Sequence, residues 1–171
     1  TKGATEAINL VASSFGKKFI NSGDEILITE LEHHSNYVPW HFIRQEKGAK
    51  IKFAEVNING EVEIDEIKKN ITNKTKIIAI THISNVTGAI TPIKKIVDIA
   101  QERNIPVLID GTQGAPHLTL DMQDLGCDFY AISCHKMYGP NGLGILYAKK
   151  KWLDLLPPYQ GGGGMINEVY K

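Results

Sequence analysis

Six short stretches of the chain are rich in aliphatic and aromatic residues, and most are apolar at consecutive positions rather than at alternate ones. The stretch from Ile77 to Ile80 is the clearest example. Continuous apolar character is typical of strands that are covered on both faces of a sheet. We therefore predict strands at residues 25–29, 51–56, 76–81, 106–110, 128–133 and 143–148.

Between these stretches, apolar residues recur at the helical spacing i, i+3, i+4 and i+7. The first helix is predicted to have Thr5 as its N-cap and to stop at Gly16, and the second has Pro92 in its first turn. A third is predicted over about residues 36–47, before Gly48. The apolar positions of the first two helices are Ile8, Val11, Ala12, Phe15, Ile93, Ile96, Val97 and Ala100. Alternating strands and helices indicate an α/β domain on a mainly parallel sheet.

The last two predicted strands lie too close along the chain for a parallel crossover. Only a short segment separates Ser133 from Leu143, whereas a crossover needs roughly a dozen residues or more. The expected fold is therefore α/β with a mixed, mainly parallel sheet flanked by helices, in one domain over residues 1–171. Thr1 replaces an initiator methionine and the chain stops after a glycine run, so we expect an internal segment of a longer chain.

Charge and cysteine content restrict the classes of partner and compartment. The 19 basic and 19 acidic residues balance, so no electrostatic footprint for nucleic acid or an anionic membrane is visible, and the basic run 149–151 is predicted to be a solvated loop. No apolar stretch approaches the roughly 20 residues of a membrane-spanning helix. Cys127 and Cys134 are too few for a disulfide framework. We expect the cytoplasm, or an organelle if a targeting segment precedes Thr1.

Polar side chains follow four of the predicted strands, where ligands of open α/β sheets bind. His33, Asn85 and Asp110 each follow or end a strand, and Lys136 comes just after another. A lysine amine can condense with an aldehyde, and a carboxylate can pair with a pyridinium nitrogen. Asp110 and Lys136 together therefore predict a site for pyridoxal 5'-phosphate (PLP).

Six ordered stretches resemble the class V, fold-type I PLP enzymes, and more narrowly the SUF-type cysteine desulfurases and the related selenocysteine lyases. One of them contains the run Ser133-Cys134-His135-Lys136. The resemblance covers essentially the whole chain and implies the large domain of a PLP-dependent transferase. The matching stretches are residues 3–12, 32–40, 81–88, 110–113, 127–140 and 161–166.

The resemblance implies a role for each residue that would hold the cofactor ring. Lys136 corresponds to the lysine that bonds covalently to the cofactor, and Asp110 to the acid that faces the pyridine nitrogen. Gln113 is implied to donate to the phenolic oxygen. His33 is implied to stack on the ring and to exchange protons, with neighbouring His34 as the alternative if the match is shifted by one residue. Lys136, His33 and Asp110 are thus the expected catalytic residues.

A second group of residues is implied to bind the cofactor phosphate and the substrate. Thr5 lies in the first turn of a predicted helix, where free N–H groups attract anions. Ala4 offers only its backbone, where the family often has a hydroxyl group. Ser133 and His135 match the other phosphate contacts, and Asn85 matches a residue near the substrate carboxylate or the ring oxygen.

The implied activity is conversion of L-cysteine to L-alanine, with the sulfur passed to an enzyme cysteine for iron–sulfur cluster assembly. The resemblance also implies a homodimer and a sulfur-acceptor protein of the SUF type. Cys127 and Cys134 do not match the nucleophilic cysteine, which the family carries downstream together with the arginine that binds the substrate carboxylate. We expect both cysteines to be buried as small apolar residues.

Other functions remain open at this point. The same fold serves selenocysteine lyases, aminotransferases and kynureninases, and a non-catalytic domain could retain it. A zinc site is disfavoured, because the histidines and cysteines show neither C-x-x-C nor H-E-x-x-H spacing. The glycine-rich segment 139–144 fits a turn before a strand rather than a nucleotide-binding loop.

Overall fold

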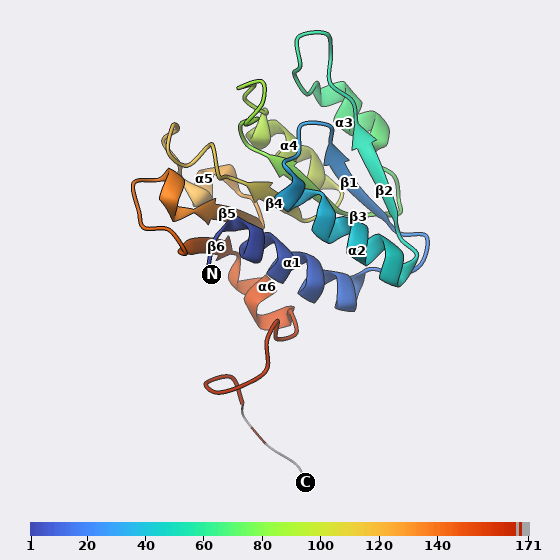
Figure 1. Ribbon diagram of the computed structural model, residues 1–171. Helices are drawn as coiled ribbons and strands as arrows, with labels where there is room; N and C mark the ends of the chain where they lie inside the picture. The colour runs from blue at the N-terminus through green and yellow to red at the C-terminus, as the bar shows by residue number, and fades with distance from the viewer. Residues whose placement is uncertain (167, 169–171) are drawn as a thin grey trace.

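A six-stranded sheet with the strand order β2-β1-β3-β4-β5-β6 forms the centre of the protein (Figure 1). The computed structural model describes residues 1–166 and residue 168. The first five strands are parallel, and β6 is antiparallel to β5, which confirms the predicted mixed, mainly parallel sheet. The strands are β1 (Glu25–Thr29), β2 (Lys50–Ala54), β3 (Thr75–Thr81), β4 (Val107–Asp110), β5 (Phe129–Ser133) and β6 (Gly144–Ala148).

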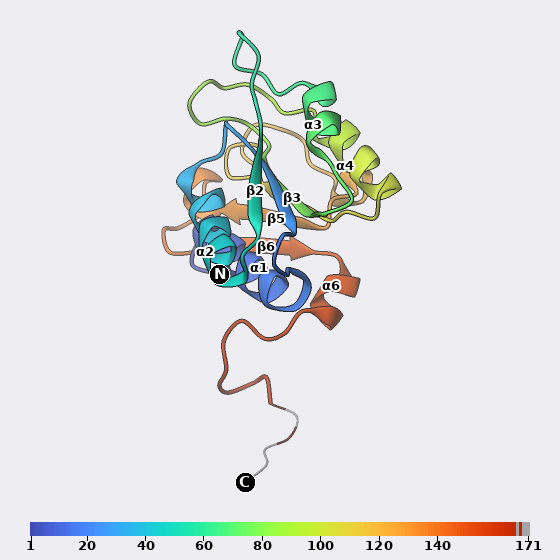
Figure 2. The same ribbon diagram turned by 90° about the vertical axis from the view of Figure 1, so that its right-hand side faces the viewer.

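Helices cover both faces of the sheet, as expected from the continuous apolar strands. Figure 2 shows α1 and α2 on one side and α3 and α4 on the other, and each side has its own cluster of buried apolar residues. Trp40 is fully buried in the first cluster. The helices are α1 (Ala4–Phe19), α2 (Val38–Lys47), α3 (Ile64–Asn70), α4 (Ile93–Glu102), α5 (Met122–Leu125) and α6 (Lys150–Leu155), with the 3₁₀ turns η1 (His34–Asn36) and η2 (Cys134–Lys136).

The boundaries of α1 differ from the prediction at both ends. The helix begins before Thr5, with Gly3 as the N-cap residue, because the Ala4 N–H finds an acceptor in the Ser133 hydroxyl group at 2.8 Å. It also continues through Gly16 to Phe19. Glycine is needed at position 16 for packing, since an added Cβ would lie 2.7 Å from Cδ1 of Ile43 on α2.

The other predicted helix boundaries are closer to the structure. α2 ends at Lys47, and Gly48 follows in the left-handed conformation with φ 69°, as the glycine signal predicts. A 3₁₀ turn replaces the predicted first residues of this helix. Pro92 is the N-cap residue of α4 instead of part of its first turn. Three short helices, α3, α5 and α6, lack a pattern long enough to predict them.

Lys150 and Lys151 of the basic run are solvent-exposed, as predicted, but residues 149–151 form the start of α6 and not a loop. Lys149 is the N-cap residue of α6, and its Nζ lies 3.7 Å from a carboxylate oxygen of Asp128, whereas that of Lys151 lies at 3.0 Å. The Asp128 side chain is only 3% exposed and also accepts a hydrogen bond from Trp152 Nε1 at 2.7 Å. A buried carboxylate needs such partners, and this one anchors α6 to the start of β5.

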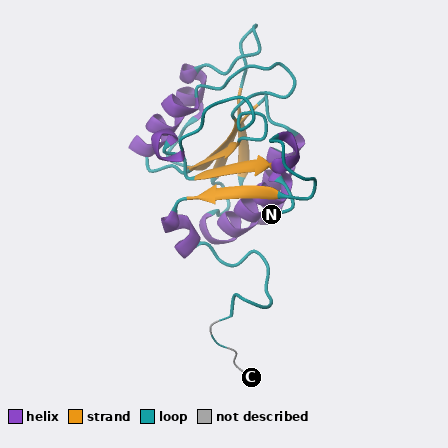
Figure 3. Cartoon of the chain, turned by 90° about the vertical axis from the view of Figure 1, so that its left-hand side faces the viewer, coloured by secondary structure: helices purple, strands orange, loops and turns teal. Residues whose placement is uncertain are grey.

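After α6 the polypeptide runs away from the sheet and its helices (Figure 3). Residues 161–166, one of the stretches that carry the family resemblance, are exposed in this segment. No helix in residues 1–166 is long and apolar enough to cross a membrane.

Replacement of Gly16 by alanine tests the close contact between α1 and α2. Glycine to alanine in a helix normally stabilises by roughly 0.5–1 kcal/mol. Here the added methyl group would collide with Ile43, so we expect the free energy of unfolding to fall by about 1–3 kcal/mol. Urea denaturation measures this change. The double variant Gly16→Ala/Ile43→Val should recover part of the loss, and stabilisation by Gly16→Ala alone would contradict the packing argument.

Candidate active site

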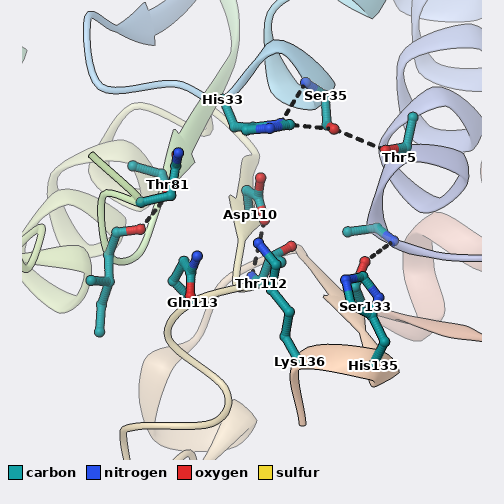
Figure 4. A pocket seen from close by; sticks show the side chains of 13 residues that line it. Thr5, His33, Ser35, Thr81, Asp110, Thr112, Gln113, Ser133, His135 and Lys136 are labelled. Carbon is teal, nitrogen blue, oxygen red and sulfur yellow. Dashed lines mark hydrogen bonds between the residues drawn. The ribbon is translucent and has the colours of Figure 1, made fainter. Parts of the chain in front are cut away.

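A cavity of about 260 Å³ opens where β1, β3, β4 and β5 end. The carboxyl ends of parallel strands meet at one edge of a sheet, so residues far apart in sequence converge there. Figure 4 shows side chains from these strand ends and from the start of α1 facing the cavity. All the site residues named from the sequence line it: Ala4, Thr5, His33, Asn85, Asp110, Gln113, Ser133, His135 and Lys136.

The N-terminus of α1 supplies backbone N–H groups to this cavity. The Ser133 hydroxyl group accepts from the Ala4 N–H, which fixes the helix end beside β5. Among the described residues, none accepts a hydrogen bond from the N–H groups of Thr5 and Glu6. The chain approaches this end closely, because a Cβ on Gly144 would lie 2.4 Å from the Gly3 Cα. Free N–H groups at a helix N-terminus attract anions such as phosphate.

Asp110 places a carboxylate on the floor of the cavity. The residue is 4% exposed, and one carboxylate oxygen accepts a hydrogen bond from the Thr112 N–H at 3.0 Å. Within the described part of the chain, no basic side chain forms an ion pair with it. A buried carboxylate without a countercharge is costly. A cationic ring nitrogen at this position would compensate it.

The turn after Asp110 rests on a buried pair, His82 and Tyr130, which the sequence analysis missed. The Tyr130 hydroxyl group and His82 Nδ1 lie 2.8 Å apart. Burial lowers the pKa of His82 and raises that of Tyr130, so both groups are neutral at neutral pH and share one hydrogen bond. A Cβ on Gly111 would lie 1.7 Å from Tyr130 Cε1, and one on Gly114 would lie 2.6 Å from His82 Nδ1. Glycines at both positions let the turn lie against the two rings and carry Gln113 to the cavity.

Glu32 is a second carboxylate near the site that sequence reasoning did not find. It accepts hydrogen bonds from the Thr29 hydroxyl group at 2.7 Å, the Asn36 side-chain amide at 2.6 Å and the Thr81 N–H at 2.9 Å. These bonds join the ends of β1 and β3 to η1. Burial of the carboxyl group raises the pKa of Glu32 to about 8, and the nearby negative charge of Asp110 acts in the same direction.

The two adjacent histidines face different spaces. His33 lines the cavity that contains Asp110 and Lys136. His34 lines a separate cavity with Glu30 and Phe53. The structure thus places His33, and not His34, in the cavity of Asp110 and Lys136.

Lys136 lies on η2, and its side chain extends into the cavity toward Asp110 and Thr112 (Figure 4). In the part of the chain that the structure describes, its amine has neither a hydrogen-bond partner nor an ion-pair partner. Cys134 precedes it by two residues, but both Cys134 and Cys127 are buried and free, and neither lines the cavity. The expectation that both cysteines are buried is confirmed.

Four further residues line the cavity without having been named from the sequence. They are Ser35, Thr81, Ile83 and Thr112. Thr112 lies between two named residues, so the rule that ligands bind after strand ends could have included it. Its hydroxyl oxygen is buried and has no hydrogen-bond partner among the described residues. Ser35 shows no sequence signal beyond its position two residues after His33.

Residues 1–171 match the family described as aminotransferase class-V. The chain therefore belongs to the class-V aminotransferase family, whose enzymes depend on PLP. Within this family it is similar to cysteine desulfurases. A probable cysteine desulfurase from Halalkalibacterium halodurans is 48% identical over 169 residues, which are 99% of this chain and 42% of that protein.

Solved structures also match this chain over nearly its whole length. The cysteine desulfurase CsdA from Escherichia coli matches with a TM-score of 0.96 and 40% sequence identity, over 99% of this chain and 43% of that one. SspA in complex with cysteine matches with a TM-score of 0.89 and 28% identity, over 96% of this chain and 47% of that one. The chain thus spans less than half the length of these relatives.

The raised pKa of Glu32 predicts a pH dependence of stability. The folded protein keeps this proton up to about pH 8, whereas the unfolded chain loses it near its ordinary value of 4.5. Between these values the folded state binds more protons, so the contribution of Glu32 to stability falls as the pH rises. Glu32→Gln, which carries no titrating proton, should flatten this part of the curve in urea denaturation between about pH 5 and about pH 8.

The exposed Glu46 on α2 provides the matched control. Glu46→Gln should leave the pH dependence unchanged. A curve for Glu32→Gln with the same slope as that of the unaltered protein would contradict the assignment of the raised pKa to Glu32.

Proposed function

We propose that this chain forms the PLP-binding part of a cysteine desulfurase, which converts L-cysteine to L-alanine and passes the sulfur to an enzyme cysteine. The observation that carries the proposal is the cavity that Lys136 and Asp110 share, an amine and a buried carboxylate that have no ion-pair partner among the described residues. The similarity to named cysteine desulfurases favours this activity over that of other class-V enzymes.

The residues of the cavity fit the cofactor in charge and in hydrogen-bonding capacity. Asp110 would pair with the ring nitrogen, and Gln113 would donate to the phenolic oxygen. The buried Thr112 hydroxyl group, which has no partner within the described residues, would gain one from a polar ligand. His33 would cover one face of the ring, and Asn85 would lie near the substrate carboxylate or the ring oxygen.

The phosphate would bind at the start of α1. The free N–H groups there and the positive end of the helix dipole favour an anion. Thr5, Ser133 and His135 would complete this part of the site, with the Ala4 backbone N–H holding the Ser133 hydroxyl group in place. Since the Ala4 N–H already donates to Ser133, the remaining donors are the N–H groups of the next two residues.

When bound, PLP supplies an electron sink that stabilises negative charge on the substrate carbon. The protein residues have three tasks around it. Asp110 would pair with the ring nitrogen and favour its protonated form, which the sink requires. Lys136 would hold the cofactor covalently and, when its amine is free, would carry a proton at Nζ. His33 would provide a second group for proton transfer.

The cysteine that accepts the sulfur is proposed to lie outside these residues. Burial raises the pKa of Cys127 to about 11, so it is a thiol and not a thiolate at neutral pH. Cys134 is also buried and lies outside the cavity lining. The sulfur-accepting cysteine and the arginine for the substrate carboxylate are expected in the further length that the relatives possess.

The proposed setting is iron–sulfur cluster assembly, with a homodimeric enzyme and a sulfur-acceptor protein of the SUF type. The support is the similarity to cysteine desulfurases, together with SspA, a matching structure in complex with cysteine. The cytoplasm is the proposed compartment. Both cysteines are free thiols, which fits a reducing environment.

Covalent attachment of PLP tests the central residue. The folded protein mixed with PLP should give a visible absorption band, and borohydride reduction should leave the cofactor mass on the peptide that contains Lys136. Lys136→Ala should abolish this adduct, because no other lysine in the described part of the chain lines the cavity with Asp110. Lys95→Ala, at an exposed position on α4, is the matched control and should retain it. A folded protein that binds PLP without forming the adduct would favour a non-catalytic domain.

Because neither Cys127 nor Cys134 is proposed to accept the sulfur, we predict that this chain alone releases no sulfide from L-cysteine. The PLP-loaded protein, incubated with L-cysteine and a reductant, should give no sulfide above the level of free PLP in a methylene-blue assay. Substantial turnover, lost on Cys134→Ala or Cys127→Ala, would show that one of the buried cysteines acts and would overturn this part of the proposal.

A further inference from the structure

A chain of hydrogen bonds joins α1 to the histidine that covers the cavity. Ser35 is its central member: its hydroxyl oxygen lies 2.8 Å from the Thr5 hydroxyl oxygen and 3.0 Å from His33 Nδ1 (Figure 4). The Ser35 backbone N–H also donates to His33 Nδ1 at 3.1 Å, so the imidazole caps the turn η1. Two groups of one serine therefore contact the same ring nitrogen.

The backbone N–H fixes the direction of the other hydrogen bonds. An N–H group only donates, so Nδ1 must accept and cannot carry the proton of the neutral ring. The Ser35 hydroxyl group faces the same lone pair at 3.0 Å, and donation to Nδ1 is the direction that avoids repulsion between two lone pairs. The Ser35 oxygen is left to accept, and the Thr5 hydroxyl group donates to it. The donors thus run from Thr5 to Ser35 to His33.

We propose that Ser35 is a positioning residue that holds His33 as the Nε2–H tautomer and links the orientation of its ring to the start of α1. Among the described residues, no group hydrogen-bonds to Nε2, so this nitrogen remains free to exchange a proton with a ligand. The catalytic use of that edge rests on the proposed function. The tautomer itself is a property of the protein without cofactor.

The direction of these hydrogen bonds also determines where the hydroxyl hydrogen of Thr5 points. The hydroxyl group of Thr5 donates to Ser35, so its contribution to an anion at the helix end is its backbone N–H. The serine is half-buried between the helix and the turn, which keeps both bonds short. Ser35 thus connects the start of α1, where the phosphate is proposed to bind, with His33, which is proposed to exchange protons.

Nitrogen-15 NMR of histidine-labelled protein without PLP tests the proposal, because the two ring nitrogens of a neutral imidazole have distinct shifts. His33→Asn identifies the His33 signals. The unaltered protein should show a predominant Nε2–H form at a pH where the ring is neutral. Ser35→Ala keeps the backbone N–H but loses the hydroxyl group, so the ratio of Nε2–H to Nδ1–H should fall roughly two- to tenfold, as for one net hydrogen bond. Ser35→Thr should restore it.

Two further variants separate the outcomes. Ser13→Ala on α1 removes a serine hydroxyl group away from the cavity and should leave the ratio unchanged. Thr5→Val should also leave it unchanged, because Ser35 still donates to Nδ1. A higher ratio in Thr5→Val would mean that Ser35 donates to Thr5 in the unaltered protein, and would overturn the proposed direction. A predominant Nδ1–H form, or no change in Ser35→Ala, would overturn the proposal.

These measurements are independent of the cofactor. A protein that fails to bind PLP but shows the expected tautomer would refute the proposed function and leave the role of Ser35 in place.

Discussion

The hydrogen bond between the Ala4 N–H and the Ser133 hydroxyl group determines where the first helix meets the sheet. It satisfies one of the free N–H groups of the helix end with a side chain from the end of β5, and so it starts the helix at Ala4. The glycine at position 144 lets the chain at Gly3 approach β6 closely enough for this contact. The remaining free N–H groups consequently point at the ends of the parallel strands, where the polar side chains gather.

The electrostatic character of the cavity follows from what surrounds its two acidic residues. Glu32 receives three hydrogen bonds from described protein groups and has a pKa raised to about 8, so its charge is largely suppressed at neutral pH. Asp110 receives one within the described residues, from the Thr112 N–H, and lines the cavity. The two carboxyl groups therefore have different tasks: one joins strand ends to the turn that carries His33, and the other is available to a cationic ligand.

Much of this architecture was predictable from the sequence. The apolar runs located every strand, and the short connection before β6 gave its antiparallel direction. Polar residues such as His33, Asn85 and Asp110 were found because they follow or end strands, a position that topology brings to one edge. The other named residues came from the family resemblance. The errors at Thr5 and Gly16 have a different origin. Each depends on a contact with a distant segment, Ser133 in one case and Ile43 in the other, that no local pattern encodes.

The same reason explains why His82, Tyr130, Glu32 and Ser35 were missed. Their types and spacing are unremarkable along the chain, and their roles arise from neighbours up to 49 residues away in sequence. The run of lysines at 149–151 was misread for a comparable reason, since its partner Asp128 precedes β5. Local periodicity predicts elements, whereas a buried polar network depends on which elements become neighbours.

The contact between the Asp110 turn and the rings beneath it has an evolutionary consequence. Tyr130 and His82 fill the space that a side chain at position 111 or 114 would occupy. A larger residue at either glycine is compatible with the fold only if the ring below it shrinks, which would also break the bond between phenol and imidazole. In descendants of this sequence, the four positions are expected to diverge jointly, so that covariation among them would report the shape of the cavity floor.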